Sequence, residues 1–151
     1  MRAPLLPQNH VAVNGMRQAG VKDIPALSKL LLSAYLGTID QEEETEAEAL
    51  IEIEKTFSGE HGPFVPECSM VMASGEELLS AALVTRWQGR PFLAFSMTNP
   101  NHKRKGLARA CLVATMEELR SRGEQELRLV VTLANNPAKR LYESLGFVLS
   151  E

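Results

Sequence analysis

In the first third of the chain, the spacing of apolar residues changes from that of a β-strand to that of α-helices. The β-branched and apolar segment 11–17 predicts a first strand. After it, apolar residues recur at i, i+3, i+4 and i+7. This predicts an amphipathic helix to about Leu36, with Asp23 as its N-cap and Pro25 in its first turn. The segment 40–54 holds eight carboxylates among good helix formers, and it predicts a second helix.

The middle of the chain has the pattern of an antiparallel meander. A loop rich in Gly and Pro spans 57–67. Three apolar segments follow, separated by short turns that contain Gly, and they predict strands at 69–73, 78–87 and 91–97. Strands joined by such short turns pair antiparallel.

The last third of the chain changes to alternating helices and strands. A broad apolar stripe predicts a deeply packed helix over 106–122. Alternating apolar residues predict a strand over 127–133, and a last helix is capped by Asn136 and ends at Gly146. We therefore expect one domain over residues 1–151, of the α/β (α+β) class, with a largely antiparallel front and a βαβ-like rear.

Charge is divided unevenly along the chain, although the net charge is only −3. Residues 1–85 hold 5 Lys and Arg against 13 Asp and Glu, whereas residues 86–140 hold 11 against 4. The basic part suits an anionic ligand and the acidic part a cationic one, unless both are simply solvated helix surfaces. No apolar run approaches the roughly 18–20 residues that span a bilayer, and the N-terminal segment lacks the apolar run of a signal peptide. We therefore expect a cytoplasmic protein with no membrane partner.

A basic turn at 103–108 follows the last strand of the meander and opens the next helix. Gly106 and Ala108 leave the backbone open to a bulky anion, and the N–H groups of a first helical turn have no partners within the helix. Further positive charge comes from Lys103, Arg104 and Lys105. The turn predicts a pyrophosphate-binding loop. The alternative is a glycine-started helix with a solvated basic run.

A second motif, N-x-x-A-x-x-L-Y-x-x-x-G-F, covers the final helix. Its specified residues are Asn135, Ala138, Leu141, Tyr142, Gly146 and Phe147. Six specified positions make a chance match rare. With this motif the chain resembles the GNAT superfamily of acetyl-CoA-dependent N-acetyltransferases from about Met16 to Phe147. The basic turn matches that family's Q/R-x-x-G-x-G/A loop except at Lys103. The resemblance implies a GNAT-like fold, with a mixed, mostly antiparallel central sheet and helices on both of its faces.

The resemblance also implies a site for acetyl-CoA. The cofactor would lie in a gap between the strand that ends at Met97 and the strand that ends at Leu133. The implied cofactor-binding residues are Met97, Thr98, Lys103, Arg104, Lys105, Gly106, Leu107, Ala108, Asn135 and Ala138. A backbone N–H near Met97 would hold the oxyanion, and Tyr142 would protonate the departing thiolate as a general acid. The alternative for Tyr142 is a packing role.

A general base is not evident, because the strand 91–97 has no acidic residue. The polar candidates nearby are Glu67, Ser96, Thr98 and His102, and none is assigned. Cys111 lies in an apolar helix without a paired His, so we expect an inert thiol there. The two cysteines indicate neither a disulfide framework nor a metal site.

Only five residues follow Gly146, whereas the family continues through two more strands, one of which inserts beside the strand 127–133. We therefore expect an uncovered sheet edge and a shortened C-terminal end. An uncovered edge favours pairing with a second copy, which predicts a homodimer. The alternative is a truncated or weakened protein.

The leading hypothesis is an N-acetyltransferase that moves the acetyl group of acetyl-CoA to a primary amine of a small molecule or peptide by direct attack. The alternative is a non-catalytic acyl-CoA-binding or regulatory module on the same fold. The basic residues 102–105 make a poor nucleic-acid contact, because the sequence pI is 5.7 and no aromatic residues are interleaved.

Overall fold

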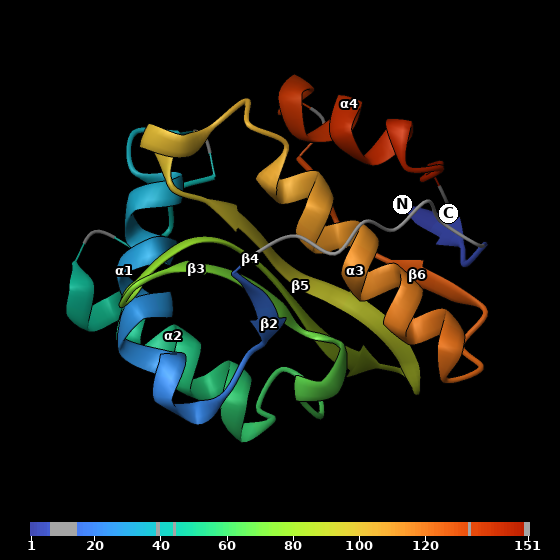
Figure 1. Cartoon of the computed structure of the whole chain (residues 1–151), viewed down its shortest axis with the longest axis horizontal. Coiled ribbons are helices and arrows are strands. Elements are labelled where there is room, and N and C mark those ends of the chain that lie inside the picture. Colours follow the sequence, from blue (N-terminus) through green and yellow to red (C-terminus); the bar gives the residue numbers. More distant parts are fainter. Residues whose placement is uncertain (7–14, 39, 44, 133, 150–151) are drawn as a thin grey trace.

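A computed structural model describes residues 1–6, 15–38, 40–43, 45–132 and 134–149 (Figure 1). Its centre is a six-stranded sheet in the order β1-β6-β5-β4-β3-β2. The strands are β1 (Arg2–Pro4), β2 (Met16–Gln18), β3 (Met70–Ser74), β4 (Glu77–Trp87), β5 (Arg90–Thr98) and β6 (Glu126–Arg128). All neighbours pair antiparallel except β5 and β6, which are parallel. The predicted class and the predicted meander are confirmed. Of the first predicted strand, positions 11–14 lie outside the described residues.

Helices cover both faces of the sheet, as predicted (Figure 1). One face packs against α1 (Ile24–Tyr35) and α2 (Glu46–Ser58), and the other against α3 (Leu107–Ser121) and α4 (Asn136–Ser144). Strand β4 shows why two cores form. Ala81 and Leu83 are buried among residues of α1 and α2, whereas Ala82 and Val84 are buried among residues of α3. Successive side chains of a strand point to opposite faces, so one apolar run serves both layers.

Helix α2 begins six residues later than predicted and also ends later. The Thr45 hydroxyl accepts a hydrogen bond from the Glu48 backbone N–H (3.1 Å), so this residue, rather than the acids before it, caps the helix. The helix continues to Ser58, where Gly59 adopts a left-handed conformation (φ 90°). Placing Phe57 in a loop was therefore wrong. Its ring packs against that of Phe64, with 4.3 Å between the centroids.

Strand β6 is much shorter than the predicted strand 127–133, because it stops at Arg128. It pairs with β5 at one position, Phe92 with Arg128, and the two strands then diverge. Val130 beyond that point is 83% exposed, so its alternation with buried Leu129 does not reflect a paired strand.

The expected uncovered edge beside β6 is filled by the N-terminal strand β1. Ala3 pairs with Leu127, and both side chains are fully buried. On its other side β1 forms a single bridge, from Arg2 to Val148. Expecting this edge to be open was wrong, and the homodimer stays a prediction without that argument.

Replacing Phe147 with Ala is expected to lower the free energy of unfolding by about 3–5 kcal/mol, measured by urea denaturation. Phe147 is 1% exposed, and its ring meets that of Tyr142 edge-on with 5.7 Å between the centroids. The adjacent Val148→Ala is the control, since Val148 is 58% exposed and its loss is expected to cost under about 0.5 kcal/mol. A Phe147→Ala protein with the wild-type midpoint would contradict this packing.

Candidate active site

The divergence of β5 and β6 opens a cleft of about 740 Å³. The end of α1, the end of β5, the start of α3 and the start of α4 surround it. It is lined by Ala34, Tyr35, Thr38, Ser96, Met97, Thr98, His102, Lys103, Arg104, Gly106, Leu107, Ala108, Arg109, Ala134, Asn135, Pro137, Ala138, Leu141 and Tyr142. Of the residues predicted for the site, the structure brings together all but Lys105. The predicted splayed gap is present, although the strand on its far side ends at Arg128.

The basic turn forms one wall of the cleft, at the N-terminus of α3. Gly106 is the N-cap of α3 in a left-handed conformation (φ 76°) and supplies no side-chain cap, so the first-turn N–H groups are not capped by a side chain. No atom lies within 4 Å of the position that a Cβ of Gly106 would take. The glycine is therefore required by its φ angle rather than by close packing. An oxyanion can accept from these N–H groups and from the helix dipole.

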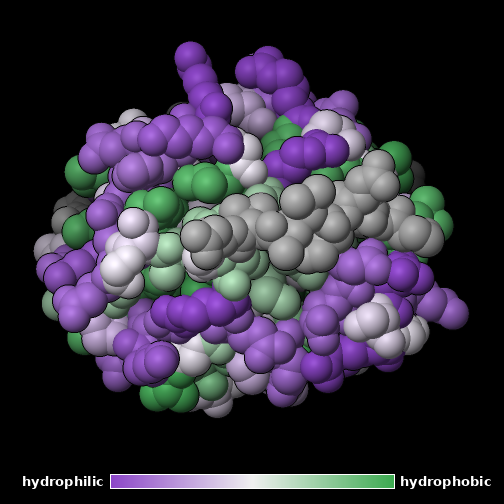
Figure 2. Space-filling view, viewed as in Figure 1, coloured by the Kyte–Doolittle hydropathy of each residue, from purple (hydrophilic) through white to green (hydrophobic). Residues whose placement is uncertain are grey.

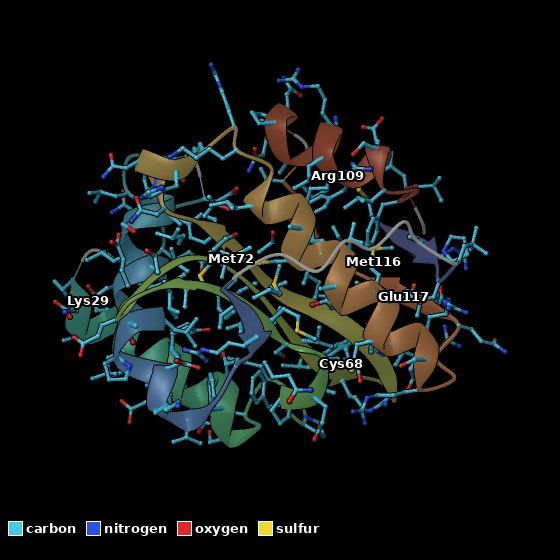
Figure 3. All side chains as sticks on the ribbon, in the orientation of Figure 1. Lys29, Cys68, Met72, Arg109, Met116 and Glu117 are labelled. Atoms are coloured by element: carbon cyan, nitrogen blue, oxygen red, sulfur yellow. The ribbon has the colours of Figure 1, made fainter. Side chains whose placement is uncertain are left out.

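The cations of this wall differ in where they point. Lys103 and Arg104 line the cleft, whereas Lys105 lies outside the lining, with its Nζ 3.3 Å from Nδ1 of His102. Arg109 extends from α3 toward α4 and donates to the Ser144 hydroxyl (2.8 Å, Figure 3). Hydrophilic side chains gather over the loop before α3 and over α4 (Figure 2). Lys103 and Arg104 thus add positive charge to the wall of the cleft beside the uncapped start of α3.

The end of β5 forms the floor of the cleft and presents backbone groups to it. The Met97 carbonyl accepts a hydrogen bond from the Ser80 hydroxyl of β4 (2.9 Å), and the Ser96 carbonyl accepts one from the Tyr35 hydroxyl (3.1 Å). Successive residues of a strand direct their backbone groups to opposite sides. The backbone of Met97 therefore faces β4, and the N–H groups of Ser96 and Thr98 face the gap.

Tyr142 reaches the cleft from α4 and is 9% exposed. Burial raises the pKa of its hydroxyl, the hydrogen bond to the Ser96 side chain lowers that pKa, and the negative charge of Asp40 raises it. The net direction is upward, so the phenol holds its proton through neutral pH. A hydroxyl that keeps its proton and lies beside the unpaired backbone groups of β5 is suited to act as a proton donor. Its aromatic ring also packs on Phe147, so packing and chemistry coexist in one side chain.

Tyr35 is a second phenol in the cleft to which sequence reasoning gave no role. Its pKa is raised, first by burial and then by the nearby Tyr142. Its hydroxyl donates to Ser96, the same residue whose side chain bonds to Tyr142. The sequence carried one signal for Tyr35, its place at the end of the first amphipathic helix.

Asn135, and not the predicted Asn136, is the N-cap of α4. Its Oδ1 accepts from the Ala138 N–H (3.3 Å), and its Nδ2 donates to Oδ2 of Asp40 (2.8 Å). Asn135 and Ala138 both line the cleft. Contact of Asn135 with the acyl-CoA arm stays a prediction, and its amide already has partners within the protein.

The polar candidates for a base separate into two groups. Ser96, Thr98 and His102 line the cleft, whereas Glu67 is exposed in the short helix Pro66–Cys68 and is not among the lining residues. Within the described residues, no lining side chain of the cleft is Asp or Glu.

The cysteines are buried away from this chemistry. Burial raises the pKa of the Cys68 thiol to about 11 and that of the Cys111 thiol to about 12, which agrees with the inert thiol expected for Cys111. Cys68 belongs to the same buried core cluster as Met72 and Met116 (Figure 3). The described residues contain no group of His, Cys, Asp and Glu arranged to hold a metal ion. In the same part of the chain, no helix combines the length and the apolar character needed to cross a bilayer.

Residues 25–147 match the family model described as the acetyltransferase (GNAT) family. The match covers most of the chain, so the chain belongs to this family. The fold, the uncapped basic helix start and the Asn135–Phe147 motif all agree with that membership.

Curated relatives match parts of the chain. The mycothiol acetyltransferase of Thermobispora bispora is 49% identical over 49 residues, which are 32% of this chain and 17% of that protein. The ribosomal protein bS18-alanine N-acetyltransferase of Salmonella typhimurium is 33% identical over 95 residues, 62% of each chain. The matches thus span less than two thirds of these relatives, 17% of the first and 62% of the second.

Solved structures share the fold. The crystal structure of the ribosomal-protein-S18-alanine N-acetyltransferase from Escherichia coli has a TM-score of 0.70 and 25% identity, covering 90% of this chain and 78% of that one. The PaiA N-acetyltransferase from Thermoplasma acidophilum, solved in complex with coenzyme A, has a TM-score of 0.68 at 17% identity, covering 89% of each chain.

Proposed function

We propose that this protein is an N-acetyltransferase that moves the acetyl group of acetyl-CoA to a primary amine of a small molecule or peptide. One observation carries the proposal: a single cleft joins the uncapped, basic start of α3 to the buried hydroxyl of Tyr142. An anion-binding end and a proton donor in one cleft suit a phosphorylated acyl donor. Family membership and the activities named for the relatives support the same reaction.

The lining residues fit acetyl-CoA along its length. The first-turn N–H groups of α3, with Lys103 and Arg104, suit the pyrophosphate. The outward backbone of Ser96 and Thr98 suits the amide-bearing arm. Asn135 and Ala138 lie where α4 begins, on the other side of that arm.

The neutral amine attacks the carbonyl carbon of the acetyl thioester, so that a C–N bond forms as the C–S bond breaks. The nitrogen gives up one proton to water, since the described lining of the cleft holds no Asp or Glu. The backbone N–H groups of Ser96 and Thr98 face the gap and can donate to an oxyanion there. The Tyr142 hydroxyl can deliver a proton to the departing sulfur. Because a thiol has an ordinary pKa of about 8.5, this proton accelerates the reaction without being indispensable.

Calorimetry with acetyl-CoA followed by a free-thiol release assay tests the proposal. The amine panel should include peptides that begin with Ala, because two relatives are named as alanine N-acetyltransferases. Saturable acetyl-CoA binding with thiol release on at least one amine is the expected result. Binding without turnover across the panel would favour the non-catalytic acyl-CoA-binding module. Absence of binding would overturn both functions.

A cytoplasmic location and a homodimer complete the proposal. Val148 already bridges the outer side of β1, so the outer edge of β2, the last strand at the other end of the sheet, is where a second copy would pair. Light scattering at micromolar concentration is the measurement, and a monomeric mass would contradict the dimer.

A further inference from the structure

The side chain of Asp40 joins two loops that flank the cleft. Its Oδ1 accepts from the Thr132 hydroxyl (2.5 Å), and its Oδ2 accepts from the Asn135 amide (2.8 Å). These partners are 92 and 95 residues away along the chain. We call Asp40, Thr132 and Asn135 the carboxylate clasp. It links the α1–α2 loop to the loop between β6 and α4.

On one side, the clasp holds a turn that is already braced by its own hydrogen bonds. The Thr38 hydroxyl donates to the Tyr35 carbonyl (2.7 Å), and the Gly37 N–H donates to Oε1 of Gln41 (2.9 Å). Tyr35 is itself anchored to Ser96 on β5. The Asp40 backbone N–H donates to the same Thr38 hydroxyl (3.3 Å), which ties Asp40 to these bonded residues.

On the other side, the clasp holds the start of the helix that carries Tyr142. Asn135 caps α4 through Oδ1 while its Nδ2 donates to Asp40, so the carboxylate fixes which way the amide points. Tyr142 follows two turns later on the same helix. The charge of Asp40 also raises the pKa values of both Tyr142 and Tyr35, which places the carboxylate near both phenols.

We propose that Asp40 is a positioning residue for acetyl transfer: through Thr132 and Asn135 it locks the α1–α2 loop against the start of α4 and so holds Tyr142 in register with the end of β5. The inference rests on the proposed function. Charge-assisted hydrogen bonds to a carboxylate are about twice as strong as neutral ones, which suits one residue to hold two loops.

Asp40→Asn and Thr132→Val test the clasp. Asp40→Asn removes the charge and one accepting oxygen, and it is expected to lower kcat by about tenfold. Thr132→Val removes one bond and leaves the charge, and it is expected to lower kcat by about threefold. Glu42→Gln is the matched control, because it removes a charge from the same loop outside the clasp and is expected to keep the wild-type kcat.

The pH profile separates the two variants. A general acid must be protonated, so activity falls as pH rises through the pKa of Tyr142. Removing the negative charge of Asp40 lowers that pKa, so the alkaline fall in kcat moves to lower pH in Asp40→Asn and stays in place in Thr132→Val. The other titratable or charged groups around the cleft are Tyr35, His102, Lys103, Arg104 and Arg109, and all are unchanged in these variants.

Hydrogen–deuterium exchange gives a readout that needs no turnover. Faster exchange at 36–41 and at 135–138 is expected in Asp40→Asn and Thr132→Val, but not in Glu42→Gln. Wild-type exchange in both clasp variants would overturn the proposal. So would a rate loss in Asp40→Asn that Thr132→Val does not share, because the carboxylate would then act by its charge alone. If the wild type binds acetyl-CoA but acetylates no amine, the proposed function fails while the exchange result still decides the clasp.

Discussion

Replacing Tyr142 with Phe is expected to lower kcat by about 100-fold while leaving the affinity for acetyl-CoA within about twofold. The substitution removes the hydroxyl and keeps the ring that packs on Phe147. A general acid contributes about 10²–10⁴-fold, and the lower end applies because a thiolate leaves without full protonation. Free-thiol release gives kcat, and calorimetry gives the affinity. In the wild type, kcat is expected to fall at alkaline pH above the ordinary pKa of a phenol, since burial raises the pKa of Tyr142. This alkaline fall is expected to disappear in the variant, because the titrating hydroxyl is removed.

Tyr35→Phe is the matched control for that experiment. Tyr35 is also a buried phenol in the cleft with a raised pKa, and its hydroxyl also bonds to Ser96. It donates to a backbone carbonyl, so its loss is expected to lower stability by about 1 kcal/mol and kcat by less than about fivefold. Full activity in Tyr142→Phe would remove Tyr142 from the mechanism. A larger loss in Tyr35→Phe would assign the proton donor to Tyr35 instead.

Local patterns predicted the elements whose signals lie within a dozen residues. The apolar alternation of β4 and the short turns on either side fixed the meander, because period and turn chemistry act over neighbouring positions. The same holds for α1 and α3, whose apolar faces and approximate bounds agree with the structure. Asp23 does precede α1, but its carboxylate accepts from Arg17 and makes no cap hydrogen bond. The cleft was predictable for a related reason. The proposed anion-binding end is a helix start and the proposed proton donor belongs to a compact motif, so each half is local in sequence.

Contacts between distant segments had no such signal. Strand β1 pairs with β6 and places Ala3 opposite Leu127. The sequence of a three-residue strand does not indicate which strand it pairs with. The early end of β6 has the same origin: alternation in the sequence continues to position 133, but pairing with β5 stops at Arg128. The carboxylate clasp is the sharpest case, because Asp40 appeared only as one acid among eight in a segment read as helix.

Replacing Gly106 with Glu is expected to weaken acetyl-CoA binding by about 100-fold or more, measured by calorimetry. The new carboxylate would stand at the uncapped start of α3 and accept from the N–H groups that suit the pyrophosphate. It would also repel the phosphates. The space around this position is open, so the side chain enters without a clash. The positive φ adds a backbone cost of roughly 1–2 kcal/mol, which lowers stability without explaining lost binding.

Gly123→Glu isolates that backbone cost. Gly123 has a similar angle (φ 86°), has open space where a Cβ would lie, and follows the opposite end of α3. Both variants are expected to lose similar thermal stability, and Gly123→Glu is expected to bind acetyl-CoA as the wild type does. Equal loss of binding in the two would mean that strain, not charge at the helix start, controls the site. Wild-type binding in Gly106→Glu would show that the phosphates lie elsewhere. The basic turn at 103–108 would then be only a solvated helix start.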